Sequence, residues 1–227
     1  MIGNGMAGVR TLEELLKIAP DMYDITVFGA EPHPNYNRIM LSPVLAGEQT
    51  LDEIVLNPVE WYAEHGITLH LGRRIERIDR VRRQVVADDG HTVPYDRLLV
   101  ATGSQPFMPP VPGRELQGVM AYRDIADTLA MIEAAGQHRD AVVIGGGVLG
   151  LEAANGLRQR GMSVTVVHLS PWLMERQLDP VAGALLARSL GERGIGFALG
   201  AHTEALLGDE AGRVRAVRLK EIGRAHV

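Results

Sequence analysis

Two glycine-rich stretches with the same spacing constrain this chain more than any other feature of its sequence. They are Gly3-Asn4-Gly5-Met6-Ala7-Gly8 and Gly145-Gly146-Gly147-Val148-Leu149-Gly150. Each fits G-x-G-x-x-G, in which the first glycine permits a tight turn, the second lets the backbone approach a pyrophosphate, and the third lets a helix lie close to a strand. The helix N-terminus then offers free N–H groups to the anion. We therefore expect two dinucleotide sites in one polypeptide.

The surrounding sequence predicts a βαβ unit around each stretch. Apolar spacing predicts a helix over 5–16 and a strand over 24–28, then strands over 141–144 and 163–168 that flank a helix over 148–160. Only Met1 and Ile2 precede the first stretch. We therefore expect the first strand of that unit to be absent and the chain to be truncated at its start.

The remaining signals predict a short antiparallel insertion and further βα elements. Asn57 as N-cap and Pro58 at the first helical position predict a helix that ends at Gly66. The hairpin signal Asp89-Gly90 lies among the strands expected in the insertion. We expect the other strands over 67–71, 75–78, 84–87, 97–101, 195–199 and 214–219, and the other helices over 124–136 and 179–194. A proline cluster at 106–112 marks the boundary between the two units.

Composition excludes several classes of function. The chain has 23 Lys and Arg against 28 Asp and Glu, a net charge of −5, so we expect no nucleic-acid partner. It contains no cysteine, which excludes disulfides, iron–sulfur ligation and a cysteine nucleophile within these residues. We expect no membrane span, no secretory signal and a cytoplasmic location. Histidines at metal-ligand spacing and a nucleophile elbow are both missing, so we expect no metal site and no classical catalytic residue.

Three residues have positions that suit either binding or structure. Glu31 follows the second strand of the first unit. It either accepts hydrogen bonds from the ribose hydroxyls, as a carboxylate does at this place in the fingerprint, or is a solvated loop residue. His168 holds the equivalent place in the second unit, either bonded to ribose or satisfied by backbone, so the choice between NADH and NADPH stays open. Glu152 lies soon after the third glycine of the second stretch. It either faces the nicotinamide and flavin or places favourable charge near a helix N-terminus.

Tyr95 to Gly103, which read Tyr-Asp-Arg-Leu-Leu-Val-Ala-Thr-Gly between the two fingerprints, resemble FAD- and NAD(P)H-dependent reductases. More narrowly, residues 1–16, 31–48 and 172–179 resemble the N-terminal part of the NAD(P)H-dependent nitrite reductase large subunit. The resemblance implies α/β architecture with two Rossmann-like units, the FAD unit truncated, and a small antiparallel β insertion. It assigns 1–110 to FAD and 111–220 to NAD(P)H. Residues 221–227 resemble a translated library adapter, a non-native tail.

The fingerprints and the resemblance together predict the cofactor-binding residues. These are Gly3, Gly5, Met6, Ala7, Gly8, Glu31, Arg38, Ser42, Ile75, Ala101, Thr102, Gly103, Gly145, Gly147, Val148, Leu149, Gly150, Glu152 and His168. By the resemblance, Arg38 and Ser42 lie beside the flavin and Ile75 offers its backbone to the adenine.

The implied function is electron transfer from NAD(P)H through FAD to the siroheme and iron–sulfur part of nitrite reductase. By the resemblance, those groups belong to downstream domains or a small subunit, which supply the cysteines that this chain does not contain. The alternatives are a ferredoxin- or rubredoxin-type reductase and a non-catalytic nucleotide-binding fragment. We also expect weak or absent retention of FAD, because the first strand and a closing segment are missing.

Overall fold

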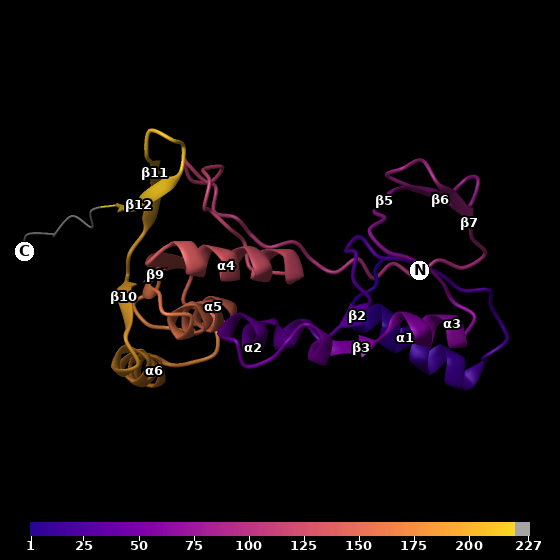
Figure 1. Ribbon diagram of the computed structural model, residues 1–227, viewed down its shortest axis with the longest axis horizontal. Coiled ribbons are helices and arrows are strands. Elements are labelled where there is room, and N and C mark those ends of the chain that lie inside the picture. Colours follow the sequence, from indigo (N-terminus) through magenta and orange to yellow (C-terminus); the bar gives the residue numbers. More distant parts are fainter. Residues whose placement is uncertain (221–227) are drawn as a thin grey trace, which may run out of the picture. The chain divides into compact units, whose positions relative to one another are not determined.

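The computed structural model describes residues 1–220 and resolves two compact units. The first comprises Met1–Ile39 and Leu51–Gln105, and the second comprises Met40–Thr50 and the described residues from Pro106 onward. Figure 1 shows the elements of both. The adapter-like residues 221–227 lie outside the described residues.

The first unit has a small parallel sheet at its centre. Its strands β1 (Thr26–Phe28) and β4 (Thr68–His70) run parallel, and Ile2 forms parallel bridges to both Phe28 and Val100. Ile2 thus takes the central strand position, between β1 and the segment ending at Ala101. The central strand position that we expected to be absent is therefore occupied by Ile2.

Helices and a separate small sheet complete this unit. Helix α1 (Met6–Ile18) buries Val9 and Leu12 in a core shared with Val27, Tyr62 and Ile67. The other helices are α3 (Val59–Glu64) and the 3₁₀ helices η2 (Asp52–Ile54) and η1 (Arg38–Met40), of which Met40 is assigned to the second unit. Strands β2 (Asn35–Tyr36) and β3 (Val55–Asn57) form the separate sheet. The expected antiparallel insertion is β5 (Ile75–Asp79), β6 (Gln84–Ala87) and β7 (Thr92–Pro94).

The second unit contains a three-stranded parallel sheet in the order β10-β9-β8. The strands are β8 (Asp140–Ile144), β9 (Ser163–His168) and β10 (Ile195–Leu199), and the helices are α4 (Ile125–Gln137), α5 (Val148–Gln159) and α6 (Pro180–Glu192). Valines on β9 contact α5 in one apolar core. Asp124 and Asp179 cap α4 and α6 by accepting backbone N–H groups, as their residue types predict. The α/β class predicted from the sequence is confirmed.

Helix α2 (Leu41–Ala46) belongs to the second unit although it lies early in the sequence. It contacts α4 and α5, and Figure 1 shows it beside α5. Leu45 is fully buried there. A Cβ at Gly156 of α5 would lie 2.7 Å from Leu45 Cγ, so the missing side chain allows the close approach. The Arg160 guanidinium donates to the carbonyls of Leu45 and Val44, which satisfies the end of α2.

Several elements differ from the sequence expectations. Asn57 is not the cap of α3; Pro58 takes that position, and the Asn57 side chain bonds to Asn35 and Glu13 instead. The Asn57 amide thus forms a buried hydrogen bond with Asn35 in preference to capping the helix. The expected strand over 97–101 forms only a bridge at Val100, beside Ile2. The antiparallel pair β11 (Thr203–Gly208) and β12 (Val214–Leu219) includes one strand that the sequence did not indicate.

Candidate functional site

The three glycines of each fingerprint have the geometry that the motif requires. Gly3 and Gly145 have φ of +102° and +119°, a conformation that side chains rarely adopt. No protein atom lies within 4 Å of a Cβ built on Gly5 or Gly147. A Cβ on Gly150 would overlap the carbonyl oxygen of Gly145. Each turn therefore leaves space above its second glycine.

Gly8, the third glycine of the first fingerprint, is closely packed, as Gly150 is in the second. A Cβ on Gly8 would lie 3.0 Å from Met1 Sδ and 3.1 Å from Ala101 Cβ. The turn itself is held by Gly3, whose N–H donates to the carbonyl of Phe28 at 2.8 Å, and by Ile2, whose carbonyl accepts from the Ala101 N–H at 2.8 Å. The first turn thus follows the carboxyl end of a parallel arrangement, where open α/β sheets bind ligands.

Tyr62 fixes the side chain between the first two glycines. Its hydroxyl donates to Asn4 Oδ1 at 2.7 Å, and the ring is buried in the core of α1, β1 and α3 with 1% exposure. Burial raises the pKa of the Tyr62 phenol to about 12, so the hydroxyl remains a donor well into the alkaline range. Sequence reasoning missed this residue, because nothing in a Trp-Tyr-Ala helix indicates a partner 58 positions away.

Glu31, Arg38 and Tyr36 form one cluster in the first unit. Arg38 Nη2 lies 2.5 Å from Glu31 Oε1, and the Tyr36 hydroxyl donates to Glu31 Oε2 at 2.7 Å. The Arg38 guanidinium also lies 5.0 Å from the centre of the Tyr36 ring. Two predicted site residues are thereby brought together. The carboxylate is held in place and retains lone pairs that can accept further hydrogen bonds.

The other predicted residues of the first unit occupy varied positions. Met6 and Ala7 form the first turn of α1 after the open glycine. Ile75 pairs with Ala87 and lies against the core of Ile2, Phe28 and Val85. Thr102 and Gly103 follow the bridged segment and are exposed, and Gly103 has φ of +71°.

In the second unit, His168 is held against the fingerprint. Its Nδ1 accepts from the Gly146 N–H at 3.0 Å, and its Nε2 lies 2.9 Å from Glu175 Oε2. The His168 side chain is 9% exposed. Of the two roles that the sequence left open for His168, the structure shows the hydrogen bond to backbone. Beside it, Val148 and Leu149 begin α5 with exposed side chains, next to the open space above Gly147.

Ser42 and Glu152 meet in the second unit. The Ser42 hydroxyl donates to Glu152 Oε2 at 2.7 Å and lies 3.0 Å from the Tyr122 hydroxyl. Burial raises the pKa of the Tyr122 phenol. Glu152 is the fifth residue of α5 and lies beyond its first turn, so the alternative of a charge at the helix N-terminus is wrong. Its partner comes from α2, which no local pattern could indicate.

The described residues 1–220 contain no cluster of His, Asp and Glu that could hold a metal ion. In the same part of the chain, no helix is both long and apolar enough to cross a membrane.

Known proteins with similar sequence or structure support the two-fingerprint interpretation. Over 221 residues the chain is 50% identical to nitrite reductase (NAD(P)H) of Bacillus subtilis strain 168, which covers 97% of this chain and 27% of that protein. It is 48% identical over 208 residues to the assimilatory nitrate reductase electron transfer subunit of the same organism, covering 92% of this chain and 27% of that protein. The chain thus spans about a quarter of the length of these relatives.

A solved structure gives the same fold. The ferredoxin reductase for the CYP199A2 system from Rhodopseudomonas palustris superposes with a TM-score of 0.88 at 27% identity, over 96% of this chain and 54% of that one. The family model described as pyridine nucleotide-disulphide oxidoreductase matches residues 1–225. The resemblance inferred from the motifs is confirmed, and the chain belongs to the pyridine nucleotide-disulphide oxidoreductase family.

Proposed function

We propose that this chain is the electron-entry module of an NAD(P)H-dependent nitrite reductase. Its first unit binds FAD at Gly3–Gly8, and its second binds NAD(P)H at Gly145–Gly150. The observation that carries the proposal is the shared geometry of the two turns, each with a left-handed first glycine and open space above its second. Family membership and the nitrite reductase relatives support the same assignment.

The chain's own residues supply binding and orientation. The free N–H groups at the starts of α1 and α5 receive the two pyrophosphates. Glu31, fixed by Arg38 and Tyr36, accepts the hydroxyls of the FAD adenosine ribose. When bound, FAD would supply the capacity to take up hydride from the nicotinamide and to release electrons singly.

The Ser42–Glu152 pair, which includes two of the predicted site residues, orders the α2–α5 region of the second unit. We propose that this pair faces the nicotinamide when the donor is bound. Its carboxylate then orients the ring and takes no part in proton transfer.

Electrons leave for a partner that holds the metal centres. The cysteine-free chain cannot ligate an iron–sulfur cluster itself. We propose that the acceptor is the siroheme and iron–sulfur part of the same enzyme, in downstream domains or a small subunit, and that the product is ammonia.

Alanine substitution at the second glycine of each fingerprint tests the proposal. A methyl group on Gly147 or Gly5 contacts no protein atom within 4 Å, so both variants fold, but the methyl occupies the space a pyrophosphate needs. Gly147→Ala should weaken NADH binding by at least ~10-fold, and Gly5→Ala should do the same for FAD. Gly136→Ala is the matched control, since its added Cβ is equally uncrowded but lies in α4.

The readouts are calorimetric binding of NADH and of FAD and, with FAD supplied, NADH-dependent reduction of ferricyanide. A parent chain that binds neither nucleotide refutes the proposal. So does a Gly147→Ala variant with unchanged affinity for NADH.

A further inference from the structure

The second fingerprint has no acid at the end of its second strand, yet a carboxylate reaches that place from a loop. The strand ends at His168, whose Nε2 lies 2.9 Å from Glu175 Oε2. Because the other ring nitrogen accepts from the Gly146 N–H, the ring proton resides on Nε2 and is donated to the carboxylate. Glu175 is therefore tied, through one imidazole, to the backbone of the fingerprint turn.

The loop that carries Glu175 is anchored at several points. Leu173 is fully buried, and the Met174 N–H donates to the carbonyl of Gly146 at 3.0 Å. Met174 has φ of +54°, a left-handed conformation that is unfavourable for a residue with a Cβ. The Trp172 indole N–H donates to the carbonyl of Leu178 at 3.0 Å, which closes the loop. These contacts hold Glu175 at a fixed position relative to Gly146.

We propose that Glu175, positioned by His168, accepts the adenosine-ribose hydroxyls at the second fingerprint and makes the chain bind NADH in preference to NADPH. This inference rests on the proposed function, because it names the donor for the site at Gly145–Gly150. It assigns to a loop residue the task that a strand-end acid performs in the usual fingerprint.

The charge and exposure of Glu175 suit this task. Its side chain is 35% exposed, against 9% for His168, so the carboxylate can meet a ligand while the imidazole stays covered. Hydrogen bonds from its own backbone N–H and from His168 lower the pKa of Glu175, so the group is ionised at neutral pH. Oε2 accepts a hydrogen bond from the imidazole, and the carboxylate keeps further lone pairs that can accept from ribose.

The same carboxylate disfavours the phosphorylated donor. NADPH carries a 2′-phosphate where NADH carries the hydroxyl, and two negative groups held side by side repel each other. Arg176, the next residue, is exposed and offers a cation that could receive that phosphate instead. Glu175 at the ribose favours NADH, whereas Arg176 there would favour NADPH. The contact between His168 and Glu175 holds the carboxylate at the fingerprint turn, so we expect Glu175 to meet the ribose.

Calorimetric titration of the full chain with NADH and with NADPH tests the proposal, and titration with 5′-AMP and 2′,5′-ADP isolates the effect of the 2′-phosphate. The parent should bind NADH at least ~10-fold more tightly than NADPH. Glu175→Gln removes the charge but keeps the shape, so NADPH should bind more tightly than to the parent and the preference should fall by ~10-fold. A gain in affinity cannot arise from damage to the fold.

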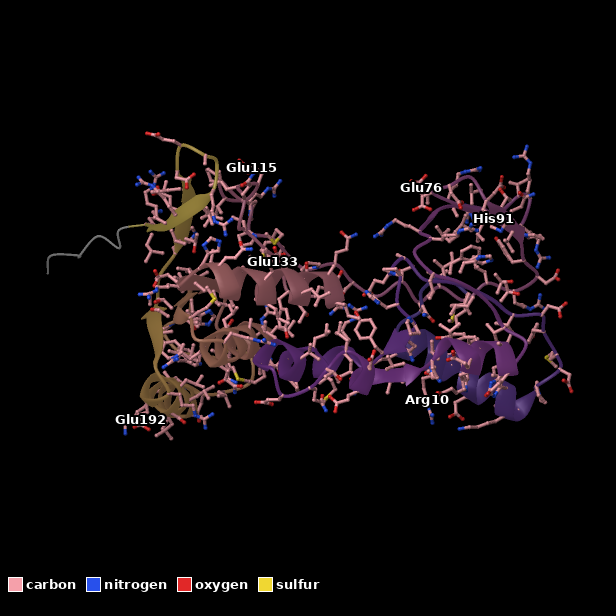
Figure 2. The ribbon with its side chains drawn as sticks, in the orientation of Figure 1. Arg10, Glu76, His91, Glu115, Glu133 and Glu192 are labelled. Carbon is pink, nitrogen blue, oxygen red and sulfur yellow. The ribbon has the colours of Figure 1, made fainter. Side chains whose placement is uncertain are left out.

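Glu192→Gln is the matched control, because Glu192 lies in the last turn of α6 in the same unit and is exposed (Figure 2). It should leave both affinities unchanged. A parent that binds both donors equally, or prefers NADPH, overturns the inference but leaves the proposed function intact. An unchanged preference in Glu175→Gln does the same. If neither donor binds the parent, the proposed function fails and this inference fails with it.

Discussion

Removing the Tyr62 hydroxyl should change the stability of the first unit in a way that depends strongly on pH. The phenol donates to Asn4 Oδ1 at 2.7 Å from a site with 1% exposure. Tyr62→Phe deletes that hydrogen bond and leaves the ring in place. A single such bond contributes about 0.5–1.5 kcal/mol, so the variant should be less stable than the parent by about that amount near neutral pH.

The alkaline side reverses the comparison. Burial raises the pKa of Tyr62 from 10.0 to about 12 in the folded chain. The stabilisation from a raised pKa is complete below the unfolded value and is lost as pH climbs through the folded value. The parent should therefore lose about 1.4 kcal/mol by pH 11, and about 2.7 kcal/mol in full, for a shift of about two units. Tyr62→Phe has no phenol and escapes this loss, so the two stabilities should converge and then cross.

Urea unfolding at pH 8 to 11 measures both effects. The chain has two tryptophans, Trp61 beside Tyr62 in the first unit and Trp172 in the second. Placing Trp172→Phe in both proteins makes the fluorescence report on the first unit alone. Other groups titrate in this range, but they are common to both proteins and cancel in the difference. A difference in unfolding free energy that stays constant from pH 8 to 11 refutes the argument about Tyr62.

Three further predictions concern the contacts of α2 and of the first unit. Gly156→Ala should destabilise the chain by about 1–3 kcal/mol, because its Cβ would lie 2.7 Å from Leu45 Cγ, whereas Gly191→Ala, which meets nothing within 4 Å, should be neutral or stabilising in thermal unfolding. Arg160→Ala should expose the 40–50 segment to limited proteolysis. Arg160→Lys keeps the charge but cannot donate to both carbonyls in the same way, so it should protect the segment only in part. Equal cleavage of the parent and both variants would contradict the capping role. Glu31→Gln should lower calorimetric affinity for FAD by ~10-fold and leave NADH binding unchanged, and equal losses for both ligands would exclude a local role for this carboxylate.

Much of the fold could be predicted from the sequence because its signals are local. Asp124 and Asp179 mark the starts of α4 and α6 through their own side chains. The valine-rich run of β9 and the glycines at the two turns act within a few residues of their positions. Asn57 was misjudged because an amide can cap a helix or pair with another amide. Only the fold brings Asn35 to 2.7 Å from it, and that contact decides between the two.

The candidate site was harder to predict because its side chains find partners far along the chain. Glu31 and Arg38 are only seven residues apart, yet the sequence offered no reason to pair them. It placed Glu31 at the ribose and Arg38 beside the flavin, which are different parts of FAD. Ser42 and Glu152 are 110 residues apart and meet because Gly156 lets α2 approach α5. The glycine that makes the approach possible carries no chemistry of its own and belongs to neither fingerprint. Positions of this kind decide which functional groups meet, and they become visible only when two helices are seen in contact.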